Sequence, residues 1–188
     1  MTKSFGIHIK RTDKKGEKRA HMNMTSAEAN KLIKQLRDQI RLLESQEENL
    51  ISFIAATTEN VEEVRPAYSY KETALKYDEL EEMIRKIKHA LNQFNASTVP
   101  EGTDMTIDEI LVFLPQATNR LRKLSAMLSR PAKLRAEGTG RTSIIEYEYL
   151  NYDLTTVQKD YDALVEKKAK VMTALDITNN TVPFDVEI

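Results

Sequence analysis

The sequence contains no cysteine. This absence excludes disulfide bonds, thiolate nucleophiles and cysteine-ligated metal centres. Tryptophan is also absent, glycine and proline occur five times each, and aromatic residues make up only 6% of the chain. Because glycine and proline are the residues that interrupt helices, their scarcity beside 30% charged residues favours a helix-rich protein.

Long hydrophobic stretches are missing as well. No apolar run approaches the roughly 18–20 residues that cross a bilayer. The N-terminus has no apolar core before a small-residue cleavage site, so a secretory signal is not expected. We therefore expect a cytoplasmic protein.

Charge is unevenly distributed along the chain. The whole protein has a net charge of -1, yet residues 1–22 hold seven basic side chains against Asp13 and Glu17. We interpret residues 1–22 as a basic flexible leader, with an anionic partner or an arm on a neighbouring subunit as the alternatives. The candidate contacts to an anionic partner, either nucleic acid or an anionic membrane surface, are Lys10, Arg11, Lys14, Lys15, Lys18 and Arg19.

Four segments carry apolar residues at alternating steps of four and three, which is typical of helices that pack along a seam. The segments cover 29–54, about 70–94, 106–130 and 153–179. Thr25 or Ser26 begins the first helix, and Thr106 with Glu109 predicts a capping box on the third. Pro115 predicts a kink or a break near Leu111.

Short extended segments interrupt this helical pattern. Residues 143–152 alternate Ile145, Tyr147 and Tyr149 with polar residues, which predicts a strand or an extended arm before the last helix. Its candidate partners are residues 181–188, the Phe5 to Ile9 run, or the same segment of another subunit. Residues 132–142 are predicted to form a flexible loop.

The four seams predict an all-α protein, namely an antiparallel four-helix bundle or coiled coil with a short β-like arm before the last helix. The predicted organisation is the leader 1–22 followed by one helical-bundle domain at 23–188. The 26-residue first seam also permits a coiled-coil oligomer.

Polar residues inside the seams are the only candidates for specific side-chain chemistry. Glu47 interrupts the first seam. If the four predicted helices run antiparallel with their ends at the same height, Glu47 lies in one layer with Tyr77, Leu124 and Tyr161. Two phenols could donate hydrogen bonds to the carboxylate, so Glu47, Tyr77 and Tyr161 form a candidate buried polar layer that sets helix register. The alternative is a half-solvated Glu47 at the rim of the bundle.

Catalytic and metal-binding patterns are not found. The three histidines are not spaced as inward-facing Glu-x-x-His pairs, and no nucleotide-binding P-loop or G-x-S-x-G nucleophile turn occurs. We therefore expect no catalytic residues, no bound metal, no cofactor and no small-molecule substrate.

A set of short stretches occurs in a recognisable order from residue 24 onward, namely 32–40, 80–87 with Asn95, 121–124, 145–153, 157–164 and 179–181. This order resembles the septicolysin-like family, a group of small bacterial helical proteins that are mostly uncharacterised. Basic residues 1–22 and Pro115 depart from the family pattern. The resemblance implies a helical fold and, through the family's haemolysin label, membrane activity, but no functional residues. The absence of cysteine argues against a cysteine-dependent lytic activity.

Taken together, these features predict a non-enzymatic helical-bundle protein that acts through protein contacts and self-associates. The extended arm and the long first helix are the expected contact elements. Two alternatives are a membrane-active protein and a nucleic-acid-binding protein that uses the basic leader.

Overall fold

The computed structural model describes residues 21–136 and 145–187, and this part of the chain is mostly helical, as predicted. The chain divides into two compact units. The first unit runs to Asn95 and resumes at Asn179, whereas the second spans Ala96–Thr178. The single helical-bundle domain expected at residues 23–188 stays a prediction.

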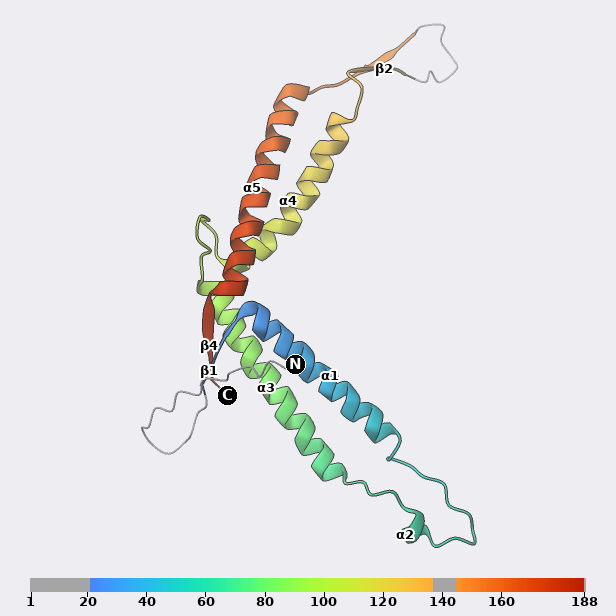
Figure 1. Cartoon of the computed structure of the whole chain (residues 1–188). Helices are drawn as coiled ribbons and strands as arrows, with labels where there is room; N and C mark the ends of the chain where they lie inside the picture. Colours follow the sequence, from blue (N-terminus) through green and yellow to red (C-terminus); the bar gives the residue numbers. More distant parts are fainter. Residues whose placement is uncertain (1–20, 137–144, 188) are drawn as a thin grey trace, which may run out of the picture. The chain divides into compact units, whose positions relative to one another are not determined.

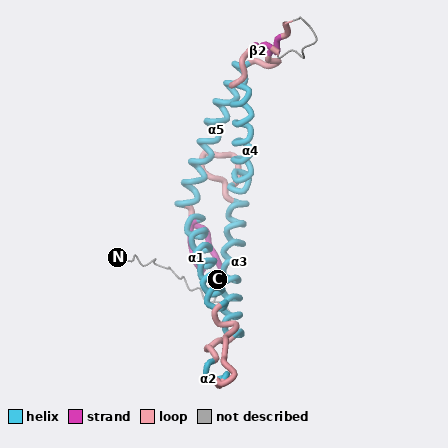
Figure 2. Tube along the Cα trace, turned by 90° about the vertical axis from the view of Figure 1, so that its right-hand side faces the viewer, coloured by secondary structure: helices cyan, strands magenta, loops and turns pink. Residues whose placement is uncertain are grey.

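The first unit is built on two long helices that lie side by side, α1 (Ser26–Glu48) and α3 (Tyr70–Ser97) (Figures 1 and 2). The connection between them contains a short helix, α2 (Val61–Val64). Thr25 caps α1 and forms a capping box with Glu28, so the first of the two predicted starting frames is confirmed. The amides of Thr25 and Glu28 at this helix start thereby find acceptors in local side chains.

Helix α1 ends earlier than its seam predicts. The structure places its end at Glu48 rather than Ile54, and the Asn49 side chain donates a hydrogen bond to the Ser45 carbonyl at 2.7 Å. The Ile54 side chain is 99% exposed, so no residue within 21–136 or 145–187 buries the far end of the predicted seam. A helix turn without a packing partner has little to stabilise it, which explains the shorter helix.

A two-stranded antiparallel sheet covers the helix pair. Strand β1 (His21–Thr25) pairs with β4 (Pro183–Glu187), and Met24 lies opposite Phe184. The buried face of the sheet packs on the helices, and the Phe94 and Phe184 rings stack with centroids 5.0 Å apart. The core of the unit consists of Met24, Ala29, Ile33, Leu36, Ile87, Phe184 and Val186.

This sheet corrects two sequence-based predictions. Strand β4 lies in the segment 181–188 that was a candidate partner for the arm at 143–152, but its partner is β1. His21 and Met22 belong to a strand and not to the flexible leader, because Met22 packs against the core. The Phe5 to Ile9 run lies outside the described residues.

The second unit contains α4 (Ile107–Leu128) and α5 (Leu154–Thr181), which also lie side by side (Figures 1 and 2). The predicted capping box at Thr106 and Glu109 is confirmed. Helix α4 continues through Pro115, so the predicted break does not occur. Pro115 and Leu111 are both exposed, so water can reach the carbonyl that the proline leaves without its helical partner.

The turn that leads into α4 requires a glycine. Gly102 has a φ of 79°, and the Thr103 amide donates to the Pro100 carbonyl at 3.1 Å. This hydrogen bond closes a tight turn with the glycine at its third position, where positive φ is needed in a type II turn. Pro100 is fully buried, so the turn is packed as well as hydrogen-bonded.

A small hairpin connects α4 to α5. Strand β2 (Lys133–Arg135) pairs antiparallel with β3 (Tyr147–Tyr149), and Leu134 lies opposite Glu148. The predicted extended arm is therefore β3, but its partner is the segment 133–135, which the sequence predicted to be loop. Each unit holds one pair of long helices, and a single bundle of four helices stays a prediction.

Candidate contact surface

The first unit carries a strong negative charge where α1 ends and α3 begins. We call residues 44–82 the acidic end. It holds eleven acidic and three basic side chains, for a net charge of -8. All of the acidic residues are exposed except the partly buried Glu47. The acidic residues are Glu44, Glu47, Glu48, Glu59, Glu62, Glu63, Glu72, Asp78, Glu79, Glu81 and Glu82, and the basic residues are Arg65, Lys71 and Lys76.

The rest of the helix pair has the opposite charge. Residues 21–43 have four basic and two acidic side chains, and residues 83–95 have three basic and no acidic ones. These two ranges sum to +5, so the charge changes sign along the helix pair. A surface of one sign on this scale attracts partners of the opposite sign over about a Debye length, near 10 Å at 0.1 M salt.

Large apolar side chains are exposed on this same acidic end. Ile54 is 99% exposed, Tyr70 is 72% exposed and Ile51 is 62% exposed, while Val61 and Val64 are less exposed. Single exposed apolar residues are ordinary, but a cluster within one connection is typical of a contact site. The acidic end therefore combines charge with apolar area that no residue of the described chain covers fully.

Glu47 fastens the connection to the helix pair. The Tyr68 hydroxyl donates a hydrogen bond to Glu47 Oε1, and the Tyr77 hydroxyl lies 3.4 Å from Glu47 Oε2. The hydrogen bond to Glu47 raises the pKa of Tyr68 to about 12. Burial, followed by the negative charge of Glu47, raises the pKa of Tyr77. Both phenols therefore stay protonated at neutral pH and act as donors to one carboxylate.

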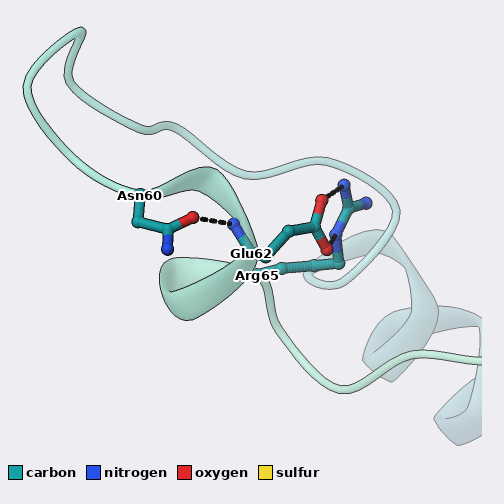
Figure 3. Close-up of polar contacts among 3 residues, drawn as sticks. All are labelled: Asn60, Glu62 and Arg65. Atoms are coloured by element: carbon teal, nitrogen blue, oxygen red, sulfur yellow. Dashed lines mark hydrogen bonds and ion pairs between the residues drawn. The ribbon is translucent and has the colours of Figure 1, made fainter.

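Polar contacts also organise α2 (Figure 3). Asn60 caps the helix, and its side-chain oxygen accepts from the Glu62 amide at 3.2 Å. Arg65 donates two hydrogen bonds to the Glu62 carboxylate, at 2.8 and 3.1 Å, and holds the pKa of that carboxyl below its usual range. The Arg65 guanidinium also lies 5.3 Å from the centroid of the Phe53 ring. These contacts give the 21-residue connection between Glu48 and Tyr70 a defined conformation, which is unusual for a plain linker.

A shallow depression of about 230 Å³ lies between α1 and α3. Leu43 and Leu80 line it and are partly buried, while Lys76 and Glu79 lie at its edge together with the well-exposed Leu42. A depression lined by both leucine and charged residues suits one apolar side chain of a charged partner.

The β2–β3 hairpin is a second exposed surface, within the other unit. The Lys133 ammonium lies 3.9 Å from the Tyr147 ring centroid and 5.3 Å from that of Tyr149. Tyr149 is 63% exposed and Leu134 is 54% exposed. Because Glu146 and Glu148 lie next to the tyrosines in the sequence and Lys133 contacts the same tyrosines, this surface has mixed charge. It lacks the large excess of negative charge found at the acidic end.

The structure brings together part of the predicted polar layer. Glu47 and Tyr77 are hydrogen-bonding partners, and both are only partly buried. Tyr161 and Leu124 belong to the other unit, so their place in one layer with Glu47 stays a prediction. Sequence reasoning missed Tyr68, because a connection has no periodicity to show which of its side chains turns back onto a helix.

The leader residues predicted to contact an anionic partner lie outside the described part of the chain. These residues are Lys10, Arg11, Lys14, Lys15, Lys18 and Arg19. Among residues 21–136 and 145–187, no group of three histidine or acidic side chains is arranged to hold a metal ion. Over the same ranges, no helix has the length and hydropathy needed to cross a membrane.

The arrangement at the acidic end is therefore a contact surface built from charge, exposed apolar side chains and a connection fastened by Glu47. No protein-family model, curated protein or solved structure matches this chain.

Proposed function

We propose that this is a non-enzymatic protein that acts through protein–protein contacts, with the acidic end as its main contact surface. The observation that carries the proposal is the presence of exposed Ile51, Ile54 and Tyr70 on a surface of net charge -8. Protein contacts place apolar residues at their centre and charged residues around them. The polar contacts of Glu47 and Arg65 hold the surface in shape before a partner arrives, which lowers the entropic cost of binding.

Self-association is part of this proposal. A pair of helices buries only one stripe of each helix, and Leu42 and Leu75 remain 60% and 53% exposed on α1 and α3. Two such pairs from two copies would supply the four helices of an antiparallel bundle. The four-helix arrangement expected from the seams would then form between chains.

Sedimentation velocity over a wide concentration range tests the proposal. We expect the unchanged chain to associate as concentration rises, and the double variant Leu42→Gln/Leu75→Gln to associate at least tenfold more weakly. The matched control is Val165→Gln/Met172→Gln, which places the same polar groups at exposed positions of α5. The control should associate like the unchanged chain.

A strictly monomeric unchanged chain at high concentration would contradict self-association. Equal weakening by the control would show that the effect is not specific to the exposed leucines of α1 and α3. Circular dichroism of each variant establishes that the helices remain folded.

A further inference from the structure

We propose that the acidic end is a docking surface for the chain's own basic leader, residues 1–20. The inference concerns the same surface as the proposed function but does not need an external partner. The test of this inference observes only the signals of the leader. The docking of the leader can therefore be refuted while the partner-binding proposal survives, and the partner-binding proposal can be refuted while the docking survives.

Charge complementarity is the first argument. Residues 1–20 hold seven basic and two acidic side chains, a net charge of +5, against the -8 of the acidic end. The leader joins the first unit at His21, in the part of the helix pair where residues 21–43 and 83–95 are net basic. Repulsion there and attraction by the acidic end act in the same direction, because both favour the leader at the acidic end.

The length of the leader is the second argument. Fully extended, 20 residues span about 66–72 Å. Helix α1 has 23 residues, so its length is about 35 Å at 1.5 Å per residue. Along an extended chain Lys10 can lie as far as about 37 Å from His21, whereas Arg19 can lie only about 7 Å away, and Phe5 reaches further than either. The leader is therefore long enough for the basic residues nearest Lys10 to lie along the acidic end, with its apolar residues beyond them.

Apolar complementarity is the third argument. The leader contains Phe5, Ile7 and Ile9. The acidic end offers exposed Ile51 and Ile54, and the same unit contains the depression lined by Leu43 and Leu80. A tethered segment also has an effective concentration in the millimolar range, so weak contacts are enough to dock it.

Paramagnetic broadening in the full-length chain gives a direct test. The chain has no cysteine, so Ser52→Cys introduces a single site for a nitroxide label in the connection between α1 and α3. We expect the nitroxide to remove most of the amide signal intensity of residues in the range 3–19 at low salt. At 1 M salt the signals should return, because the Debye length falls to about 3 Å.

Charge variants give the second arm of the test. We expect Glu44→Lys/Glu48→Lys, in the label background, to restore most of the leader signals at low salt. The matched control Asp160→Lys/Glu166→Lys makes the same charge change on exposed positions of α5 and should leave the broadening intact. If the first variant fails to fold, the salt series on the chain with native charges still decides.

Three results would overturn the inference. Leader signals that are unaffected by the label at low salt show that the leader is not docked. Broadening that survives both 1 M salt and the Glu44→Lys/Glu48→Lys change shows that charge does not hold it. Broadening between a labelled chain and a separate isotope-enriched chain, without broadening inside one chain, shows that the occupant is a second copy.

Discussion

Tyr68 donates a hydrogen bond to Glu47, a residue 21 positions earlier in the chain. This contact joins the connection that follows α2 to the last turn of α1, and Tyr77 of α3 approaches the other oxygen of the same carboxylate. One acidic side chain therefore links three segments of the acidic end. Hydrogen bonds to a charged group are stronger than those between neutral groups, so the link should be measurable.

Replacing Glu47 with glutamine should loosen the connection. The amide keeps the size of the side chain but removes the negative charge that two phenols share. We expect amide hydrogen exchange in residues 49–69 to become severalfold faster, while the core around Ile87 keeps its protection. Glu48→Gln is the matched control, because Glu48 is exposed and adjacent. Unchanged exchange in Glu47→Gln would show that the carboxylate does not hold the connection.

The Tyr68 hydroxyl gives a pH dependence with a defined sign. Its pKa in the folded chain is raised to about 12, above the value near 10 of an unfolded tyrosine. The contribution of the Tyr68–Glu47 bond to stability is therefore fully present below about pH 10 and is lost as pH rises through 12.

Phenolate absorbance during an alkaline titration checks this expectation. Tyr68→Phe should remove one late-titrating group from the curve, because the pKa of Tyr68 is raised to about 12. If Tyr68→Phe instead removed a phenol that ionises at lower pH than about 12, the raised pKa of Tyr68 would be contradicted.

Truncation in the core should cost far more than truncation on the acidic end. Ile87 is completely buried in the first unit, so Ile87→Ala should lower the free energy of unfolding by about 2–5 kcal/mol. Ile54 is 99% exposed, so Ile54→Ala should change it by less than about 0.5 kcal/mol. Urea unfolding followed by circular dichroism measures both values. Similar costs at the two positions would contradict the assigned core.

The capping box of α4 should make a smaller contribution. The Thr106 hydroxyl accepts from the Glu109 amide at 3.3 Å, and the Glu109 carboxylate accepts from the Thr106 amide at 2.7 Å. Thr106→Ala should lower the free energy of unfolding by about 1 kcal/mol, because the helix start loses its side-chain acceptor. Thr173→Ala, at an exposed site inside α5, should be close to neutral or slightly stabilising, because alanine favours helix. Thermal unfolding compares the two variants.

The turn before α4 should reject a side chain at Gly102. Alanine there meets open space, with Lys170 Cε as the nearest atom at 3.8 Å, so crowding is not the problem. The φ of 79° is the problem, and we expect Gly102→Ala to destabilise the second unit by about 1 kcal/mol. Exchange of the Thr103 amide, which donates within the turn, should quicken. A stabilised variant would contradict the assigned backbone conformation.

Local features were predictable from sequence. The helix starts at Thr25 and Thr106 are set by residues three positions apart, so the capping boxes needed no knowledge of the rest of the chain. Asp153, just before α5, acts in the same local way, because its carboxylate accepts from the Thr155 and Thr156 amides. The helical seams likewise follow from periodicity, since a helix repeats its buried face every three to four residues.

Contacts between distant segments were decided by tertiary structure alone. A seam shows that one face will be buried, but not against which other seam, so the packing of α1 with α3 in one unit had to come from the structure. The same holds for strands: residues 183–187 pair with 21–25 and residues 147–149 with 133–135, because pairing depends on the path of the chain. The sequence by itself therefore determined which segments form the four long helices and about where they begin, but it did not show the short helix α2. The tertiary structure decided which segments pack together, and with that the position of Tyr68 on Glu47. The physical reason is that burial stabilises the packing of any complementary apolar face, and local sequence does not specify which face that is.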